Sequence, residues 1–384
     1  MVEYSPKRIL VTGGAGFIGS SFVRLVADKY PHYTVVVLDR LAYCSSMLNV
    51  EPYVSAGRVK FIKGDVTNTD MVNFVLLSER IDTVVHFAAE THVDNSFGSS
   101  LLFSRSNILG THVLLEAVRA HMPAIRRFIH VSTDEVYGEN KGEMFTEKTS
   151  TLDPTNPYAA TKASAEMLVK AYQQSYSLPI IISRGNNVYG PRQYPEKVVP
   201  KFIHRAMRGM TMCIHGPGQQ LRSYLHVDDV AAAFDTILHR GVTGEVYNIG
   251  TEAEISISQL AQMVCAAFSL DPTTHIEHVE DRCINDQRYK MDASKLESLG
   301  WAPKIAWDNG FAATIEWYTK HAAYWKDIDD ALSPHPLKHP NPSVWTCKIP
   351  PAVADVTSST VAGFTMGVAV GALLAFAYAW HIPR

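Results

Sequence analysis

The sequence predicts an α/β protein with a Rossmann-type doubly wound parallel sheet, a smaller C-terminal lobe and a C-terminal transmembrane helix. Three observations support this prediction. Short apolar runs typical of buried parallel strands alternate with amphipathic helical stretches through the first half of the chain. From about residue 185 the alternation gives way to mixed short elements that contain several prolines. Residues 361–380 form an uncharged stretch long enough to span a bilayer as a helix.

The first predicted strand, residues 8–12, ends in the glycine-rich turn Gly13-x-x-Gly16-x-x-Gly19, and an amphipathic helix follows. Strand, glycine turn and helix in this order let backbone amides approach a pyrophosphate at the positive end of the helix. Asp39 ends the second strand, about twenty residues after the last glycine, where a carboxylate binds ribose hydroxyls and repels a 2′-phosphate. The expected cofactor is therefore NAD.

The third and fourth strands also end in candidate cofactor contacts. Asp65 can reach an adenine amino group, although an Asp in such a place is, taken alone, more often a helix cap. Ala88 and Ala89 are small residues where a dinucleotide needs a close approach. From the first four strands, the candidate cofactor-binding residues are Gly13, Gly16, Phe17, Ile18, Gly19, Asp39, Asp65, Val66, Ala88 and Ala89.

A hydroxyl and two adjacent carboxylates follow the central predicted strand. Thr133, Asp134 and Glu135 therefore lie at the carboxyl edge of the sheet, where open α/β sheets bind ligands. Tyr158 and Lys162 are four residues apart in a predicted helix, so their side chains lie on one face. An ammonium one turn from a phenol favours the phenolate, a base usable near neutral pH. These five residues are the candidate catalytic groups.

Composition argues against other classes. With 384 residues, 46% of them hydrophobic and 19% charged, the chain is globular and long enough for two lobes and a tail. A net charge of −3, without basic runs that contain aromatics, argues against nucleic-acid binding. The five cysteines are scattered and never spaced as Cys-x-x-Cys, which indicates neither a metal site nor a disulfide framework. The N-terminus lacks an apolar secretory region, so we expect a cytosol-facing catalytic part.

The same patterns predict the domain organisation. Residues 1–184 form an NAD-binding Rossmann domain, and residues 185–332 form a substrate-binding lobe with return elements to the Rossmann domain. Residues 333–360 are a Pro-rich linker. Residues 361–380 are predicted to anchor the protein to a membrane, with a helix buried against the enzyme or a frayed extension as the alternative.

Taken together, these motifs resemble the extended short-chain dehydrogenase/reductase family of nucleotide-sugar enzymes. The resemblance covers about residues 7–330 and depends on the glycine turn, Asp39 and Tyr158-x-x-x-Lys162. Within the family, the Thr-Asp-Glu run at 133–135 is similar to that of the nucleoside-diphosphoglucose 4,6-dehydratases. Residues 184–191 and 194–197 resemble the substrate segment of these dehydratases. The sequence as a whole, including residues 330–334, is most similar to the animal-type dTDP-glucose 4,6-dehydratases.

The resemblance implies further contacts and a partner. Arg222 and Arg288 are also candidates for a diphosphate on chemical grounds because guanidinium groups fork onto phosphate oxygens, although either alone is more often a salt-bridge partner. A homodimer through the helix that carries Tyr158 and its neighbouring helix is implied, and no metal is implied. The implied substrate contacts are Thr91, Thr133, Asn187, Glu196, Lys197, Arg222 and Arg288, and the additional cofactor contacts are Ser106, Tyr158 and Lys162.

The implied activity is the NAD-dependent dehydration of dTDP-glucose to dTDP-4-keto-6-deoxyglucose. Tyr158 takes the proton of the 4-hydroxyl while a hydride leaves C4, with Lys162 lowering the pKa of the phenol and Thr133 bonding the oxygen. Glu135 then removes the C5 proton, and protonated Asp134 donates to the departing 6-hydroxyl. The hydride returns to C6.

Two alternatives remain open at this point. UDP-glucose is the main rival substrate because one methyl group on a base is worth only about 1–3 kcal/mol in a hydrophobic pocket. A protein of a different class, a non-catalytic NAD-binding scaffold on a membrane, would need neither the Tyr-Lys pair nor the two carboxylates. The presence of all five candidate catalytic residues favours the enzyme.

Overall fold

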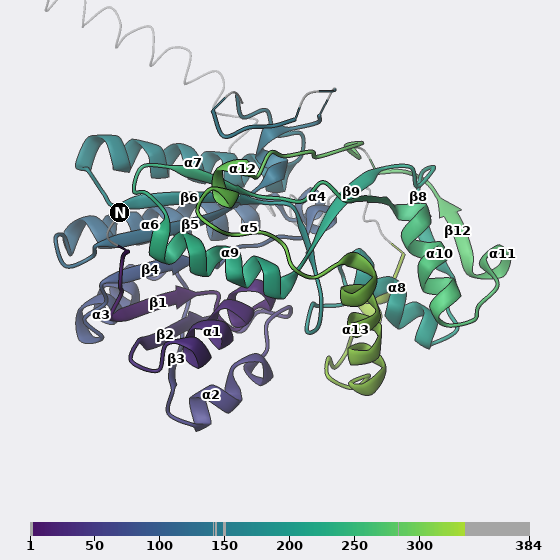
Figure 1. The fold of residues 1–384 in the computed structure, drawn as a ribbon, viewed down its shortest axis with the longest axis horizontal. Helices are drawn as coiled ribbons and strands as arrows, with labels where there is room; N and C mark the ends of the chain where they lie inside the picture. The colour runs from purple at the N-terminus through teal and green to yellow at the C-terminus, as the bar shows by residue number, and fades with distance from the viewer. Residues whose placement is uncertain (1–2, 141, 143, 149–150, 283, 335–384) are drawn as a thin grey trace, which may run out of the picture. The chain divides into compact units, whose positions relative to one another are not determined.

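Seven parallel strands form the central sheet in the described part of the chain (Figure 1). This computed structural model describes residues 3–140, 142, 144–148, 151–282 and 284–334. The strand order is β10-β6-β5-β4-β1-β2-β3, so the chain moves from the centre to one edge and then to the other, which confirms the predicted doubly wound arrangement. The strands are β1 (Arg8–Thr12), β2 (Thr34–Asp39), β3 (Val59–Lys63), β4 (Thr83–His86), β5 (Arg127–Thr133), β6 (Ile180–Gly185) and β10 (Val246–Ile249).

Helices cover both faces of this sheet, which explains why the strands read as nearly continuous apolar runs. Successive residues of a strand point to opposite faces. In β1, Val11 packs with the helices of one face and Leu10 with those of the other, and both are fully buried. The first face is covered by α1 (Phe17–Lys29), α9 (Val227–Arg240) and α12 (Ser294–Glu297), and the second by α3 (Thr69–Ser78), α6 (Gly110–Ala120) and α7 (Pro157–Tyr176).

Short elements connect the strands at the carboxyl edge of the sheet. They include a π-helical turn, η2, directly before α6, and the 3₁₀ turn η3, directly after β5. Turns of the π type are frequent at functional sites because they shift the side chains of one helical turn. The connecting elements at this edge are η1 (Met47–Asn49), α4 (Val93–Gly98), α5 (Ser100–Phe103), η2 (Ser104–Leu109) and η3 (Asp134–Tyr137). The short helix α2 (Glu51–Ser55) instead lies directly before β3, where Tyr53 bonds Asp28 near the end of α1.

A second group of elements, later in the sequence than β6, has its own apolar core and lies on the right of Figure 1. Two small sheets belong to it, in the orders β11-β9-β7 and β12-β8. The chain returns from this group to the large sheet through β10, which pairs with β6. The elements are β7 (Asn187–Tyr189), α8 (Val198–Met207), β8 (Met212–His215), β9 (Leu221–His226), β11 (Glu254–Ser256), α10 (Ile257–Ala267), α11 (Pro272–His275), β12 (Ile276–Val279), α13 (Trp307–Lys320) and α14 (Asp329–Leu332).

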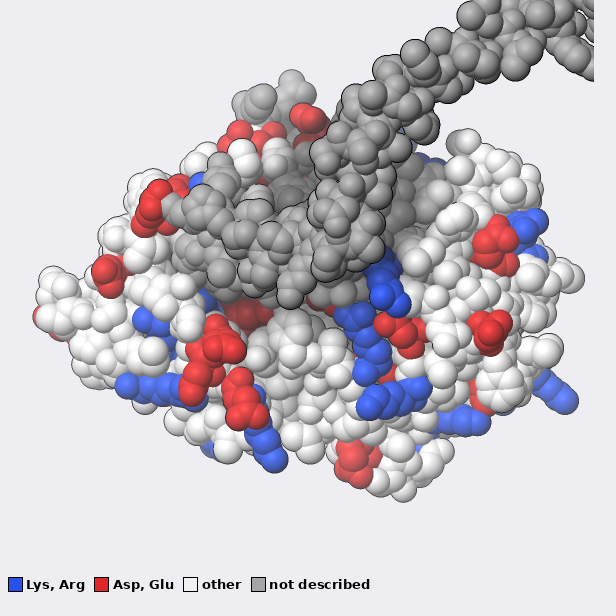
Figure 2. Space-filling model, turned by 180° about the vertical axis from the view of Figure 1, so that it is seen from behind, with Lys and Arg blue, Asp and Glu red and all other residues white. Residues whose placement is uncertain are grey.

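The surface carries charges of both signs. On the face shown in Figure 2, acidic and basic side chains are interspersed with large uncharged areas. A phosphorylated ligand would therefore be held by individual side chains near its binding site, as the net charge of −3 already indicates.

The prediction of a transmembrane helix as part of the fold was wrong. Within the described ranges, no helix is both long and apolar enough to cross a bilayer. The longest of them, α7, has 20 residues, but Lys162, Glu166 and Lys170 interrupt its apolar character. The residues that carried the prediction, 361–380, lie outside the described part of the chain, as do residues 335–360 of the predicted linker.

Candidate active site

One cavity of ≈ 300 Å³ opens at the carboxyl ends of the central strands. Nearly all the predicted site residues line it, because the carboxyl ends of parallel strands meet at one edge of a sheet. Two predicted residues, Arg222 and Arg288, are not among the described residues of its lining. Those that line it are Gly13, Gly16, Phe17, Ile18, Gly19, Asp39, Asp65, Val66, Ala88, Ala89, Thr91, Ser106, Thr133, Asp134, Glu135, Tyr158, Lys162, Asn187, Glu196 and Lys197.

The glycine turn leaves room for a dinucleotide. A Cβ on Gly13 would lie 2.6 Å from the Ala88 nitrogen, and one on Gly19 would lie 2.4 Å from the Gly13 oxygen. Gly16 is the N-cap of α1, and within the described chain no side chain accepts a hydrogen bond from the first turn of this helix. The amides at this helix start are therefore available to a pyrophosphate.

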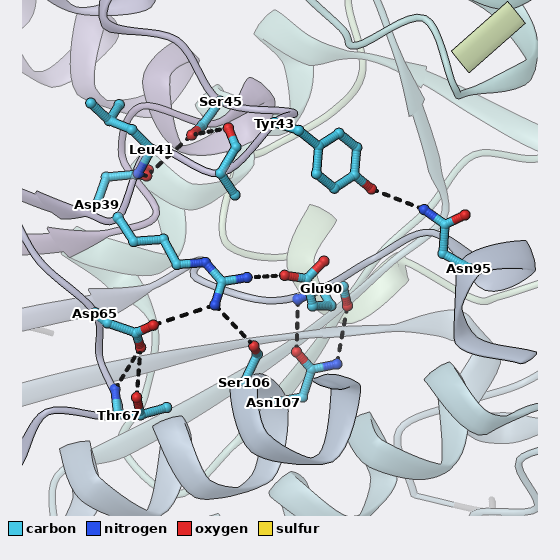
Figure 3. A network of polar contacts seen from close by, with 12 residues as sticks. Asp39, Leu41, Tyr43, Ser45, Asp65, Thr67, Glu90, Asn95, Ser106 and Asn107 are labelled. Atoms are coloured by element: carbon cyan, nitrogen blue, oxygen red, sulfur yellow. Dashed lines mark hydrogen bonds and ion pairs between the residues drawn. The ribbon is translucent and has the colours of Figure 1, made fainter. Parts of the chain in front are cut away.

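Asp39 fits the ribose of NAD. Its carboxylate is 7% exposed and accepts hydrogen bonds from the amides of Ala15, at 3.0 Å, and Leu41, at 2.8 Å. The bond from Leu41 is drawn in Figure 3. Both bonds fix the carboxylate, which lines the cavity next to the glycine turn. A fixed negative charge here accepts hydrogen bonds from ribose hydroxyls and repels a 2′-phosphate, so the residues present fit NAD.

Replacing Gly13 by Ala tests the close approach at this turn. Gly13 has φ +69°, and its new Cβ would also collide with Ala88, so we expect a loss of about 3 kcal/mol in the free energy of unfolding and at least about tenfold weaker NAD binding. Gly57→Ala is the matched control, since Gly57 has φ +68° and an ideal Cβ there meets no described atom within 4 Å. It should cost only about 1 kcal/mol and leave NAD binding unchanged. Urea denaturation measures the free energy of unfolding, and fluorescence titration measures NAD binding. Equal effects of Gly13→Ala and Gly57→Ala would contradict the explanation.

Arg40 is a site residue that the sequence reasoning missed. Its guanidinium lies 3.3 Å from Asp65, 3.4 Å from the Ser106 hydroxyl, and in an ion pair with Glu90 (Figure 3). Arg40, which follows β2, thereby contacts Asp65 after β3, Glu90 after β4 and Ser106 in η2. No local signal distinguishes this arginine from a solvated one, because its three partners are distant in the sequence.

Thr133, Asp134 and Glu135 lie where β5 passes into the turn η3. The Thr133 hydroxyl donates to Asp134 Oδ1 at 3.0 Å and accepts from the Glu135 amide at 3.3 Å. Two amides bind the carboxylates: Asn186 donates to Asp134 Oδ2 at 2.7 Å, and Asn156 donates to Glu135 Oε2 at 2.9 Å. Each carboxylate is thus held separately, although the two residues are adjacent.

The two carboxylates resist ionisation to different extents. Burial, and then the charge of Glu135, raises the pKa of Asp134 to about 7, despite opposing hydrogen bonds from Asn186 and Thr133. Burial also raises the pKa of Glu135, which Asn156 and nearby cations lower. Asp134 is 3% exposed, whereas Glu135 retains more accessible surface. An acid form of Asp134 beside an ionised Glu135 is therefore accessible near neutral pH.

Tyr158 and Lys162 occupy the first two turns of α7 and face the cavity. Asn156 caps this helix by accepting from the Ala159 amide at 2.9 Å, and Pro157 starts it. The Lys162 ammonium donates to the Val131 carbonyl at 2.6 Å. This bond fixes the Lys162 side chain against β5, one helical turn from the phenol.

The electrostatics of Tyr158 differ from the expectation from sequence. Burial, followed by the charges of Glu135 and Asp134, raises the pKa of Tyr158, while a hydrogen bond between Tyr158 and Thr133 lowers it. Burial lowers the pKa of Lys162 to about 8. The protein alone therefore favours the neutral phenol, because Tyr158 is buried and two carboxylates lie near it. Periodicity shows which residues share a face but not which of their charges dominates.

The predicted substrate contacts divide into two groups. Lys197 donates to the Thr91 carbonyl at 2.7 Å, and Glu196 accepts from the Tyr43 hydroxyl at 2.7 Å, so both lie at the cavity wall. Arg288 instead forms a bidentate ion pair with Glu254. Arg222 lies over the ring of Tyr289, with 5.0 Å between the guanidinium carbon and the ring centroid. For Arg288 the geometry matches the salt-bridge alternative that the sequence left open.

Further residues of this site were not predicted. Asn186 and Asn156 hold the two carboxylates, and Tyr43 holds Glu196. A signal existed for Asn156, because an Asn followed by Pro is a typical start of a helix. Neither Asn186 nor Tyr43 has such a signal, since their partners lie far away in the sequence.

Comparison with known proteins places this geometry in a family. The family described as GDP-mannose 4,6 dehydratase matches residues 10–314. The chain is a member of this family. This family match, with the relatives and the solved structure described next, confirms the predicted resemblance to the extended short-chain dehydrogenase/reductases and, within them, to dTDP-glucose 4,6-dehydratases.

The chain is similar to two relatives and one solved structure of known description. It is 52% identical over 338 residues to a trifunctional UDP-glucose 4,6-dehydratase/UDP-4-keto-6-deoxy-D-glucose 3,5-epimerase/UDP-4-keto-L-rhamnose-reductase of Arabidopsis thaliana, covering 88% of this chain and 50% of that one. It is 46% identical over 339 residues to dTDP-D-glucose 4,6-dehydratase of Mus musculus, covering 87% and 95%. A dTDP-glucose 4,6-dehydratase of Streptomyces venezuelae, solved with NAD bound, has 38% identity and a TM-score of 0.79, covering 83% and 99%. The chain thus spans about half the length of the plant relative.

Proposed function

We propose that this chain is an NAD-dependent dTDP-glucose 4,6-dehydratase, a hydro-lyase that forms a 4-keto-6-deoxy sugar. The observation that carries the proposal is the pair Asp134 and Glu135, two adjacent acids on the cavity that also holds Tyr158 and Lys162. A Tyr-Lys pair serves any oxidation at a sugar hydroxyl. Two further carboxylates with separated protonation states are what the loss of water also needs, since one group removes a proton and the other supplies one.

The first step is an oxidation at C4 of the sugar. The glycine turn and Asp39 would hold NAD, which would supply the hydride acceptor for C4 and the hydride donor for C6. Tyr158 in its phenolate form accepts the proton of the 4-hydroxyl. The positive charges of Lys162 and of the nicotinamide ring of bound NAD would favour this form against burial and the two carboxylates. Thr133 lies beside Tyr158 and can bond the same oxygen. Lys162, fixed to the Val131 carbonyl, adds a positive charge close to the phenol. The product of this step is a 4-ketone.

The second step is the loss of water across C5 and C6. The new carbonyl acidifies the hydrogen on C5, and Glu135 in its ionised form removes that proton. Asp134 in its acid form donates a proton to the departing 6-hydroxyl, which leaves as water. Asn156 holds Glu135 and Asn186 holds Asp134, so the base and the acid keep separate positions. Tyr158 or solvent then reprotonates C5.

UDP-glucose is the second candidate substrate, favoured by a specific observation. The Arabidopsis relative, described as a UDP-glucose 4,6-dehydratase, is 52% identical, and the mouse dTDP-D-glucose enzyme is 46% identical. Thymine and uracil differ by one methyl group, and a hydrophobic pocket gains only about 1–3 kcal/mol of binding free energy from one methyl group. An enzyme that accepts both sugar nucleotides is compatible with that small difference.

The experiment is a comparison of both sugar nucleotides. The full-length protein is incubated with NAD and either dTDP-glucose or UDP-glucose, and the 4-keto product is followed by its absorbance in alkali. With deuterium at C4, we expect the label on the new methyl group. Label that washes out or stays at C4 would contradict the mechanism. NAD binding without turnover of either nucleotide would favour the non-catalytic scaffold.

We further propose a homodimer formed through α6 and α7. Large apolar side chains are exposed on α7 and on the short elements directly before α6: Met167 of α7 is 61% exposed, Leu101 of α5 62% and Leu109 of η2 46%. Burying such a surface against a second copy would stabilise both copies. Sedimentation equilibrium measures the mass, and a monomer at micromolar concentration would contradict the proposal. The cytosolic location of the catalytic part stays a prediction.

A further inference from the structure

A fully buried ion pair lies directly behind the catalytic groups. Glu166, in α7, is 0% exposed, and Arg184, in β6, is 1% exposed. The guanidinium binds the carboxylate with two hydrogen bonds, Nε to Oε1 at 3.0 Å and Nη2 to Oε2 at 2.6 Å. Buried pairs of this kind bring a large desolvation cost and are weak contributors to stability. A role at the neighbouring site is therefore a better explanation of this pair than stability.

The pair touches each segment that carries a catalytic group. Glu166 lies one helical turn after Lys162, on the same face of α7. The guanidinium of Arg184 lies over the ring of Tyr137, 4.6 Å from its centroid, and Tyr137 belongs to the turn η3 that begins with Asp134. Arg184 also precedes the strand end from which Asn186 reaches Asp134.

Few charged groups face Lys162. His86 in β4 and His130 in β5 are buried near it, and burial together with the Lys162 charge lowers both pKa values, that of His86 to about 3. Both are therefore neutral near pH 7. On its own helix, Lys162 has Tyr158 on one side and Glu166 on the other, and the Glu166 carboxylate opposes the effect of burial on the Lys162 pKa.

We propose that Glu166 and Arg184 are positioning residues of this site: Glu166 keeps the Lys162 side chain charged, and Arg184 fixes Glu166 and supports the turn that carries the two catalytic carboxylates. This inference deepens the proposed dehydratase function and rests on it. Neither residue lines the cavity, so both act through Lys162 and Tyr137. Lys170, which lies 3.8 Å from Glu166 at the helix surface, is too exposed to replace Arg184.

The test is the alkaline side of the pH profile of C4 oxidation in a single turnover, followed as NADH formation, because the acid form of Asp134 controls the alkaline side of the later water loss. Lys162 must be charged to support the phenolate of Tyr158, so activity is lost as the pH rises through the Lys162 pKa. Glu166→Gln removes the nearby negative charge, and we expect the alkaline limb to move to lower pH by about one unit, with KM little changed. Glu166→Asp retains the charge and should return the limb most of the way to the wild-type position.

The control is another buried, paired carboxylate. Glu79 is 8% exposed and pairs with Arg8 and Lys60 before β4, at the edge of the sheet opposite the cavity. Glu79→Gln can lower stability but should leave the limb in place. If Glu166→Gln does not fold, the double variant Glu166→Gln with Arg184→Met removes both buried charges and answers the same question. A folded variant of either kind with an unmoved limb overturns the proposal.

A second readout works without turnover. Acetic anhydride reacts with neutral amines, and mass spectrometry of the peptide containing Lys162 gives the pKa of that side chain from the pH dependence of labelling. We expect this pKa to fall by about one unit in Glu166→Gln and to remain unchanged in Glu79→Gln. If the wild type converts neither sugar nucleotide, the proposed function fails, whereas an unmoved labelling pKa in Glu166→Gln makes the positioning role fail separately.

Discussion

Replacing Tyr158 by Phe is expected to lower kcat about 10³-fold, the largest loss from any single change at this site. The variant lacks the group that accepts the proton of the sugar 4-hydroxyl, and a positioned acid or base accounts for about 10²–10⁴-fold in rate. Tyr158 is 7% exposed, and its ring packs near Phe103, so the ring of Phe should occupy the same space. Formation of the 4-keto sugar at saturating substrate measures the effect.

The matched control for this change is Tyr172→Phe. Tyr172 lies further along α7, and its hydroxyl bonds His112 and Glu116 on the neighbouring helix. Removing that hydroxyl alters the same helix by the same atom but leaves the cavity intact, so kcat should change less than about twofold. A Tyr158→Phe enzyme that keeps half of the wild-type rate would show that a different group takes the proton.

The fold could be predicted largely from local patterns. β1 to β5 read as apolar runs because parallel strands covered on both faces need them, and the turn at Gly13 is marked by residues that tolerate a positive φ. Sequence could not show that the helical stretch before β5 contains the π-helical turn η2, because a π turn differs from an α turn only in which carbonyl each amide meets. The return of β10 to the main sheet also depends on tertiary pairing.

The candidate site was predictable wherever a residue ends a strand or shares a helical face with another. Asp39, Asp134 and Tyr158 follow these rules, and the structure brings them to one cavity. Arginines do not follow such rules, because a long side chain finds partners far from its backbone. Arg40 therefore joins three strand ends without any local signal, and Arg288 pairs with Glu254 outside the cavity.

Asp134→Asn and Glu135→Gln are expected to stop the reaction at different points. Both should lower product formation at least about 10²-fold, since each removes one proton-transferring group. The amides keep the shape of the acids and can still accept the hydrogen bonds from Asn186 and Asn156, so the fold should persist. In Asp134→Asn the base Glu135 remains, and we expect the C5 hydrogen to exchange with solvent without loss of the 6-hydroxyl. In Glu135→Gln this exchange should stop too.

The measurement is a reaction in deuterated water, with the sugar nucleotide recovered and analysed by mass spectrometry and NMR. Deuterium at C5 with an intact 6-hydroxyl is the result expected for Asp134→Asn, and no deuterium is expected for Glu135→Gln. If the two variants exchange C5 equally, or only Glu135→Gln does, the acid and the base have been assigned to the wrong residues.

The pH dependence of elimination gives the same assignment a second check. Burial and the neighbouring Glu135 raise the pKa of Asp134 to about 7, and this group must be protonated to act as the acid. Its contribution is therefore present below that pH and is lost as the pH rises through it. The rate of water loss in the wild type should fall above about pH 7, and in Asp134→Asn this fall should be absent from the residual rate. Because the two acids interact, the measured values describe the pair. If the wild-type rate of water loss stays level between about pH 6 and about pH 9, another group protonates the departing hydroxyl.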